Sequence, residues 1–154
     1  MSNLDDTDKK ILELLQNNAK LTIREIAAQL NLSTTPIFDR IKRLEKNQII
    51  VKHVALLDKT KIGKKLTCFV QISIKDHSLA LVKEFTRKVN SLDEVMECYH
   101  ISGDADYMIK VVVRDMDEYN DFLLSKMSKV PNIYRHKTQF ALSCTKYSTA
   151  FKNI

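Results

Sequence analysis

The segment Leu32–Ile50 (LSTTPIFDRIKRLEKNQII) combines a helix start, an apolar helical face and a cluster of cations. Ser33 is a good N-cap, because its hydroxyl can accept a hydrogen bond from a backbone N–H that the first turn leaves unpaired. Pro36 falls inside the first turn, where it costs no helical hydrogen bond. Apolar positions then recur at helical spacing, at Ile37, Ile41 and Leu44. The segment therefore predicts an amphipathic helix with a polar, basic outer face.

Two further helices are expected before this one. Residues 22–25 (TIRE) have the form of a capping box and are followed by apolar positions at helical spacing. Asp5 or Asp6 can cap an earlier helix, whose apolar face would come from residues 11–15. Only a very short connection, residues 31–32, separates the second helix from the third. This arrangement predicts a helix-turn-helix, with the third helix as the recognition helix for DNA.

The outer face of this recognition helix and its surroundings supply the candidate DNA-binding residues. Cations would contact phosphates, and these are Arg24, Arg40, Lys42, Arg43, Lys46 and Lys52, with His53 beside them. Polar groups near the helix start, with Arg40 or Arg43, would face base edges, and these are Ser33, Thr34, Thr35 and Asp39. Asp39 repels phosphate, so we expect it to pair with a neighbouring cation or to accept from a cytosine amino group. The alternative is a helical bundle with a solvated charged face.

Charge and composition exclude several classes of protein. The net charge of +6 and the pI of about 9.2 favour a polyanionic partner. Residues 1–60 hold ten Lys or Arg against eight Asp or Glu, a balance of only +2, so the local cluster of cations in the recognition helix is stronger evidence for DNA binding than the net charge.

No apolar run approaches the roughly 20 residues that cross a bilayer. The N-terminus is acidic and polar where a signal peptide would be basic and then apolar, so a cytoplasmic protein without membrane contact is expected. Widely spaced cysteines predict buried free thiols at Cys68, Cys98 and Cys144.

The remainder of the chain changes to strand-like periodicity. Residues 49–57 predict a wing strand, and the polar residues 58–65 predict a linker. Strand, helix, strand, strand, helix and strand then follow, at residues 66–74, 79–89, 95–102, 107–113, 119–130 and 134–144. This order predicts an α+β chain, with a winged helix-turn-helix in residues 1–60 and a ferredoxin-like βαββαβ sandwich in residues 64–154. Two helices would cover one sheet face. The other face, which would hold Phe69, needs a second subunit, so a homodimer is expected.

Short sequence motifs in both halves of the chain are more specific to one protein family than the order of helices and strands is. In the first half they are Leu4-Asp5-x-x-Asp8-x-x-Ile11-Leu12, Leu32-Ser33-x-Thr35-Pro36 and Arg40-Ile41-x-Arg43-Leu44-Glu45. In the second half they are the run from Glu97 to Tyr107, then Asp115-Met116, Tyr119 and Lys146. Together they resemble the Lrp/AsnC (feast/famine) family of transcriptional regulators, over essentially the whole chain.

Two positions depart from the pattern of that family. Gln48 stands where most members have glycine after the recognition helix, so we expect the left-handed helix cap at Asn47. Asp39 stands where many relatives carry a cation or a longer side chain, so no particular operator sequence is carried over.

The resemblance implies a homodimer that assembles further, often to an octamer, and that binds and bends double-stranded DNA under the control of a small amino acid. No cofactor or metal is expected. The implied effector site lies between dimers, with Ser102, Gly103, Asp104, Ala105, Asp106 and Tyr107 from one subunit and Thr138 and Phe140 from a neighbour. Asp104 or Asp106 would pair with the ammonium group, and Thr138 and backbone N–H groups would meet the carboxylate. Alternatively, both carboxylates of the turn satisfy local backbone donors.

An enzyme is the competing class, and the chain offers no catalytic constellation. Glu97 and His100 are spaced i, i+3 on a strand, which sends their side chains to opposite faces. The four histidines show no ligand spacing, and two glycines leave no phosphate-cradling loop. A nucleoid-architectural protein that packs DNA without an effector shares the fold and is the alternative to a sensing regulator.

Overall fold

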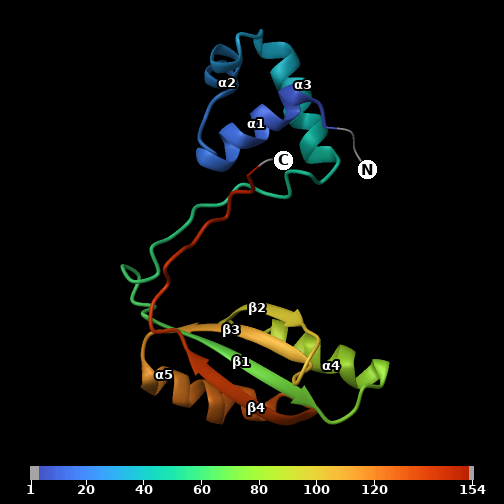
Figure 1. Cartoon of the computed structure of the whole chain (residues 1–154), viewed down its shortest axis with the longest axis vertical. Helices are drawn as coiled ribbons and strands as arrows, with labels where there is room; N and C mark the ends of the chain where they lie inside the picture. The colour runs from blue at the N-terminus through green and yellow to red at the C-terminus, as the bar shows by residue number, and fades with distance from the viewer. Residues whose placement is uncertain (1–3, 153–154) are drawn as a thin grey trace. The chain divides into compact units, whose positions relative to one another are not determined.

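The computed structural model describes residues 4–152, and the chain divides into two compact units (Figure 1). The first unit contains the described residues up to Leu56 together with those from Thr145 onward. The second unit is Leu57–Cys144.

The C-terminal residues join the first unit through a side chain of the first helix. The Phe151 N–H donates to Gln16 Oε1 over 2.7 Å, and Gln16 Nε2 donates to the Phe151 carbonyl over 3.3 Å. The predicted domain of residues 64–154 includes this stretch, which the structure groups with the N-terminal helices instead. A contact between residues so far apart in the chain leaves no periodic pattern in the sequence.

The first unit is built from three helices, α1 (Asp6–Asn17), α2 (Ile23–Leu30) and α3 (Thr34–Lys46). The capping box predicted at Thr22 and Glu25 is present, and a second one, formed by Asp5 and Asp8, begins α1. Asn31 takes the left-handed conformation (φ 53°) that turns the chain from α2 into α3. The apolar faces of the helices meet in one core, whose most buried side chains are Ile11, Ile26, Ile37 and Leu44. The predicted helix-turn-helix is confirmed.

Both ends of α3 differ from the expectation. Ser33 is the N-cap residue, but its side chain forms no capping hydrogen bond. The left-handed residue after the helix is Gln48 (φ 57°), whereas Asn47 has a φ of −82°. The backbone N–H groups of Gln48 and of the next residue donate to carbonyls of the last turn over 3.0 Å and 2.9 Å. This is a Schellman ending, which places the left-handed residue one position beyond the capping residue.

The prediction of a wing strand at residues 49–57 is wrong. This stretch, which is described throughout, forms no hydrogen-bonded strand. A strand requires a neighbour that pairs with its backbone, and a β-rich composition does not supply one. Several apolar side chains of the stretch are consequently exposed: Val51, Val54, Leu56 and Leu57.

The second unit has the predicted βαββαβ order (Figure 1). Its elements are β1 (Leu66–Ile74), α4 (Leu79–Asn90), β2 (Val95–His100), β3 (Tyr107–Val113), α5 (Met116–Asp121) and β4 (Ile133–Phe140). A π-helical turn, η1 (Phe122–Lys126), and a 3₁₀ turn, η2 (Met127–Lys129), continue α5. The strands form one antiparallel sheet in the order β2-β3-β1-β4.

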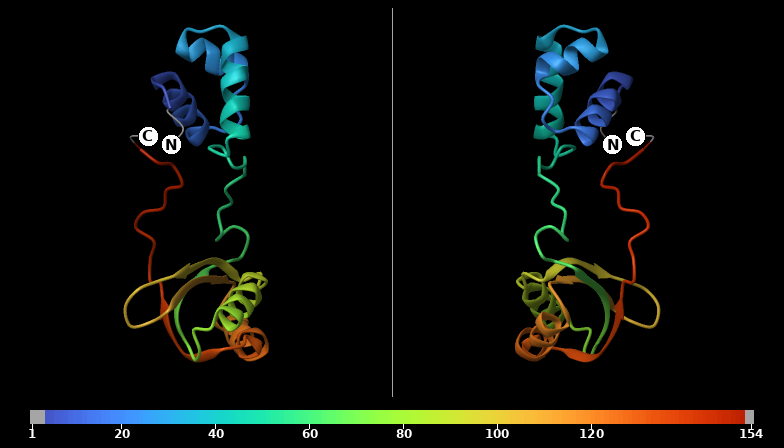
Figure 2. Two further views of the ribbon diagram at one scale, coloured as in Figure 1. Left: turned by 90° about the vertical axis from the view of Figure 1, so that its right-hand side faces the viewer. Right: turned by 90° about the vertical axis from the view of Figure 1, so that its left-hand side faces the viewer.

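Both helices lie on one side of this sheet, as Figure 2 shows. Alternate residues of β1 and β3 point to that side, and the core there is formed by side chains that include Val70, Ile72, Phe85, Ile109 and Phe122. We call the other side the open face. Most of its β1 and β3 positions, among them Phe69, Gln71, Met108 and Lys110, are only partly buried, whereas Thr67 is buried. The predicted coverage of a single face by helices is confirmed.

The three cysteines differ in burial. Cys68 is buried in the core, Cys98 is half-buried, and Cys144 is exposed, which corrects the expectation of three buried thiols. Burial raises the pKa of the Cys68 thiol to about 11. Within residues 4–152, none of the helices has the length and apolar content needed to span a bilayer.

Candidate functional site

The outer face of α3 carries most of the side chains predicted to meet DNA. Thr34, Thr35, Asp39, Lys42 and Lys46 are all exposed, on the side of the helix away from the core. The Asp39 carboxylate forms no ion pair within the described part of the chain, so the pairing with a neighbouring cation expected from the sequence is absent. Ser33 lies exposed at the helix start.

Two further predicted cations lie outside this helix. Arg24 is exposed on α2, and Lys52 is exposed in the stretch after α3. Neither of them forms an ion pair with a residue of α3 in the described part of the chain. Their place in a DNA contact therefore stays a prediction.

The two arginines of α3 are held by acidic side chains of the first helix. Arg43 Nη2 lies 2.7 Å from Asp8 Oδ2, and Arg40 Nη1 lies 2.8 Å from Asp8 Oδ1. Arg40 Nη1 also lies 2.5 Å from Asp5 Oδ2. The Asp8 side chain is only 2% exposed, whereas the Arg40 and Arg43 side chains are 27% and 53% exposed. The cluster therefore ties α3 to α1 through one buried carboxylate.

The electrostatics of this cluster follow from its hydrogen bonds. The Asp8 N–H, together with the Arg40 guanidinium, holds the pKa of the Asp5 carboxyl below its usual value. Asp8 accepts from both arginines and donates its own N–H to Asp5, so a single residue joins the helix cap to the recognition helix. No such pairing was predicted for Asp8 from the sequence. The recurrence of Asp5-x-x-Asp8 and Arg40-x-x-Arg43, both one helical turn apart, is the signal that would have identified it.

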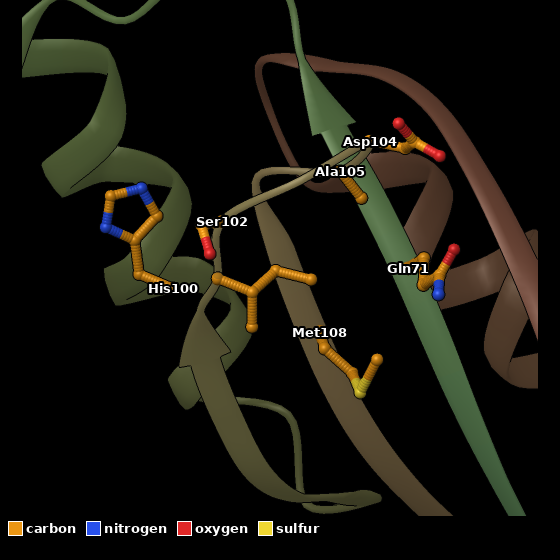
Figure 3. A pocket seen from close by; sticks show the side chains of 7 residues that line it. Gln71, His100, Ser102, Asp104, Ala105 and Met108 are labelled. Carbon is orange, nitrogen blue, oxygen red and sulfur yellow. The ribbon is translucent and has the colours of Figure 1, made fainter.

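A second candidate site lies at the turn between β2 and β3. A pocket of about 610 Å³ is lined by Gln71, His100, Ile101, Ser102, Asp104, Ala105 and Met108 (Figure 3). Ser102, Asp104 and Ala105 are predicted effector residues, whereas Gln71 and Met108 come from neighbouring strands and were not foreseen. Gly103 has a φ of 114°, which favours glycine at the tip of the turn.

The other two predicted residues of this turn have structural partners. Asp106 Oδ2 accepts from the Ile74 N–H over 2.9 Å, and Asp106 Oδ1 lies 3.4 Å from His77 Nε2. Tyr107 is 4% exposed, and its ring contacts the rings of Phe85 and His100, with centroid distances of 4.7 Å and 4.9 Å. The Asp106 carboxylate therefore satisfies a backbone donor, as the alternative expected, but that donor belongs to β1 and not to the turn itself.

Thr138 and Phe140 lie on the helix-covered face of the sheet. In the register they stand opposite Val70 and Cys68, which point into the core. Thr138 Oγ1 lies 2.5 Å from the Tyr119 hydroxyl, and the Phe140 ring meets the Tyr119 ring edge-on at 5.2 Å. A single chain therefore does not bring these residues to the pocket, whose strand residues Gln71 and Met108 lie on the open face.

No group of three or more His, Cys, Asp or Glu side chains in residues 4–152 is arranged to hold a metal ion.

A helix-turn-helix with a basic recognition helix, joined to an α+β domain with a pocket at a hairpin turn, defines a DNA-binding protein with a ligand-binding domain.

Comparison with known proteins gives the family. The chain matches the family models of the Lrp/AsnC ligand binding domain over residues 67–151 and of a winged helix-turn-helix DNA-binding domain over residues 4–51. The chain belongs to the Lrp/AsnC family and is a DNA-binding transcriptional regulator of that type. The resemblance inferred from the motifs is thereby confirmed.

Relatives support this assignment along the whole chain. The transcriptional activator DecR of Escherichia coli K12 is 38% identical over 147 residues, which cover 96% of this chain and 97% of that protein. The crystal structure of an AsnC family regulator from Agrobacterium tumefaciens has a TM-score of 0.91 at 38% identity, covering 96% of this chain and 95% of the other. A regulator from Neisseria meningitidis, solved as a complex with L-Met, has a TM-score of 0.91 at 30% identity, with coverages of 97% and 96%.

Proposed function

We propose that the second unit senses a small amino acid at the pocket beside the Gly103 turn, and that this ligand modulates DNA binding by α3. The observation that carries the proposal is the pocket itself, which combines a hairpin turn with polar and apolar lining residues. The L-Met complex of the related regulator from Neisseria meningitidis supports an amino acid as the ligand class.

The chemistry of the lining residues fits a free amino acid. The exposed Asp104 carboxylate forms no hydrogen bond or ion pair within the described residues, so it is free to pair with the ammonium group. Asp106 is less suited, because its oxygens already engage a backbone N–H and His77. Ser102 and the Gln71 amide offer hydrogen bonds to the carboxylate, while Ile101 and Met108 offer apolar contact to a side chain.

A homodimer through the open face is part of this proposal. Phe69 and Lys110 lie on that face and are only partly buried in one chain. A second copy would bury the Phe69 ring, and Glu97, which lies 2.7 Å from Lys110 Nζ, would keep that cation paired. Assembly of dimers into an octamer would bring Thr138 and Phe140 of a neighbouring subunit to the pocket.

The proposed DNA contacts follow the exposed face of α3. Lys42 and Lys46 would contact phosphates, and Thr34 and Thr35 would face base edges at the start of the helix. Arg40 and Arg43 would act mainly by fixing α3 against α1, because Asp8 already neutralises part of their charge.

A thermal-shift screen of the purified protein against the twenty amino acids tests the sensing proposal. A ligand that binds only the folded state raises Tm once its concentration exceeds Kd. We expect a selective rise for one or a few amino acids, and Asp104→Asn should abolish it. Asp121→Asn, which changes an exposed carboxylate on α5, is the matched control and should keep the response.

A flat profile with all twenty amino acids, in a protein that binds DNA normally, would contradict the sensing proposal. It would favour the alternative, an effector-independent architectural protein. A selective rise that survives Asp104→Asn would place the ligand outside this pocket.

A further inference from the structure

An exposed aromatic side chain lies among the polar residues of the recognition helix. Phe38 is 44% exposed, and it is the one large apolar residue of α3 that is exposed to this degree; the structure describes every residue of this helix. Ile37 and Leu44, by contrast, are almost fully buried in the core. Because residues three and four apart share a helix side, Phe38 lies on the same side as Thr34, Thr35 and Lys42. It therefore belongs to the surface that an Lrp/AsnC regulator presents to DNA.

A neighbouring cation restricts the orientation of the ring. Lys42 Nζ lies 5.8 Å from the centroid of the Phe38 ring, one turn further along the helix. The same ammonium group lies 3.4 Å from Glu45 Oε2, which limits its freedom. The exposed ring is thus an apolar group beside a positive charge on the outer side of α3. The Lys42 ammonium group can attract phosphate there, and the ring itself faces outward.

The chemical groups exposed in the major groove determine which base-edge feature a phenyl ring can recognise. Each base pair presents there a pattern of donors and acceptors, and thymine alone adds an apolar group, its C5 methyl. A phenyl ring has no hydrogen bond to offer, so the thymine methyl is the base-edge feature that it can distinguish by contact.

We propose that Phe38 is a specificity-determining residue that contacts the C5 methyl group of a thymine in the major groove. Thr34 and Thr35 supply hydrogen bonds to neighbouring bases, and Lys42 holds the ring in place while it contacts phosphate. The proposal extends the established DNA binding of the family to one chemical group of the target, and it does not depend on the effector.

The experiment uses thymine-to-uracil replacement, which removes only the methyl group and keeps the base pairing. A duplex is first selected from a random pool by the full-length wild-type protein. Each thymine is then replaced singly by uracil, and binding is measured by fluorescence anisotropy at one fixed salt concentration. For the wild type, we expect at least one replacement to weaken binding by about fourfold, the factor that corresponds to burying one methyl group.

Variants assign that effect to the ring. In Phe38→Ala the same uracil replacement should change the affinity by less than about 1.5-fold, because no ring remains to touch the methyl group. Phe38→Leu keeps an apolar side chain and should retain part of the sensitivity. Lys46→Ala, which removes an exposed cation of the same helix other than the one beside the ring, is the matched control: it should weaken binding to every duplex and still discriminate thymine from uracil.

Several outcomes would overturn the proposal. Equal sensitivity to uracil in the wild type and Phe38→Ala, or no sensitivity in either, means that the ring reads no methyl group. Equal weakening by Phe38→Ala on the selected duplex and on random-sequence DNA means that the ring acts without base preference. A change in molecular mass of Phe38→Ala, measured by light scattering, means that the ring contacts another protein chain. Helical circular dichroism confirms beforehand that each variant is folded.

Discussion

At the scale of single residues, Asp8 has two roles in the first unit. It caps α1 together with Asp5, and it is the buried partner of both arginines of the recognition helix. Removing one partner from a buried ion pair costs more than the pair contributes, because the remaining charge loses its compensation.

Asp8→Ala should therefore lower the free energy of unfolding by about 1–3 kcal/mol, less than for a fully buried pair because Arg40 and Arg43 are partly solvated. Urea denaturation followed by circular dichroism measures this change. Asp6→Ala, an exposed carboxylate in the same first turn, is the control and should cost much less. Equal costs for the two variants would show that the ion pairs contribute little.

Gln48 occupies a strained position, since a residue with a Cβ adopts the left-handed conformation there at φ 57°. Gln48→Gly should raise the free energy of unfolding by roughly 0.5–1 kcal/mol, because glycine adopts this conformation without the steric penalty. The control is Asn47→Gly, at a residue with a negative φ, which should not stabilise the protein. Stabilisation by Asn47→Gly instead would contradict the Schellman assignment.

At the scale of elements, the start of α5 depends on two carboxylates. Asp115 Oδ1 accepts from the Glu118 N–H over 2.9 Å, and Glu118 pairs with Lys64 at 2.8 Å and accepts from the Arg114 N–H. The Glu118 N–H lowers the pKa of Asp115, and the Lys64 ammonium lowers the pKa of Glu118. The ionised forms of both carboxyl groups therefore stabilise the folded state.

The sign of the pH dependence follows from these lowered pKa values. The contribution to stability is fully present above the ordinary values of 3.8 and 4.5, and it is lost as the pH falls through the lower values of the folded state. Unfolding by urea at pH 7, 5, 4 and 3 should show this loss. Glu118→Gln should make the pH dependence shallower than Glu84→Gln, which changes an exposed side chain of α4; identical profiles would contradict the assignment.

The open face of the sheet makes a prediction about self-association. Phe69 lies on this face, opposite Lys110 and Gln139 in the two flanking strands. If a second copy covers the face, Phe69→Glu places a buried charge in the interface and should convert the dimer to a monomer that keeps its circular dichroism. Leu79→Glu, at an exposed position of α4, is the control and should leave the mass unchanged in light scattering. An unchanged mass of Phe69→Glu would place the dimer interface elsewhere.

At the scale of the whole molecule, the cations of α3 should govern how DNA binding depends on salt. Removing one phosphate contact lowers the slope of log K against log salt by about one unit. Lys46→Ala removes an exposed cation and should lower the slope by that full amount, whereas Arg43→Ala should lower it less and also reduce stability. A larger decrease for Arg43→Ala than for Lys46→Ala would mean that Asp8 releases Arg43 to phosphate on binding.

The sequence by itself determined the elements whose residues contact near neighbours. The spacing of apolar residues identified the helices of the first unit, because a helix face repeats every three to four residues. The alternation of Leu66–Ile74 identified a strand with one buried face, and the motifs identified the family. Most of the predicted DNA-binding residues are indeed exposed on α3 or beside it.

Only the tertiary structure decided which of these side chains are already engaged by distant partners. Asp8 lies more than thirty positions from Arg40 and Arg43 in the chain, and Asp106 is as far from Ile74. The failure of residues 49–57 to form a strand, and the place of Thr138 on the helix-covered face, also depend on neighbours remote in sequence. Periodicity reports which face of an element is apolar, whereas ion pairs, strand pairing and pockets arise only when the chain brings separate elements together.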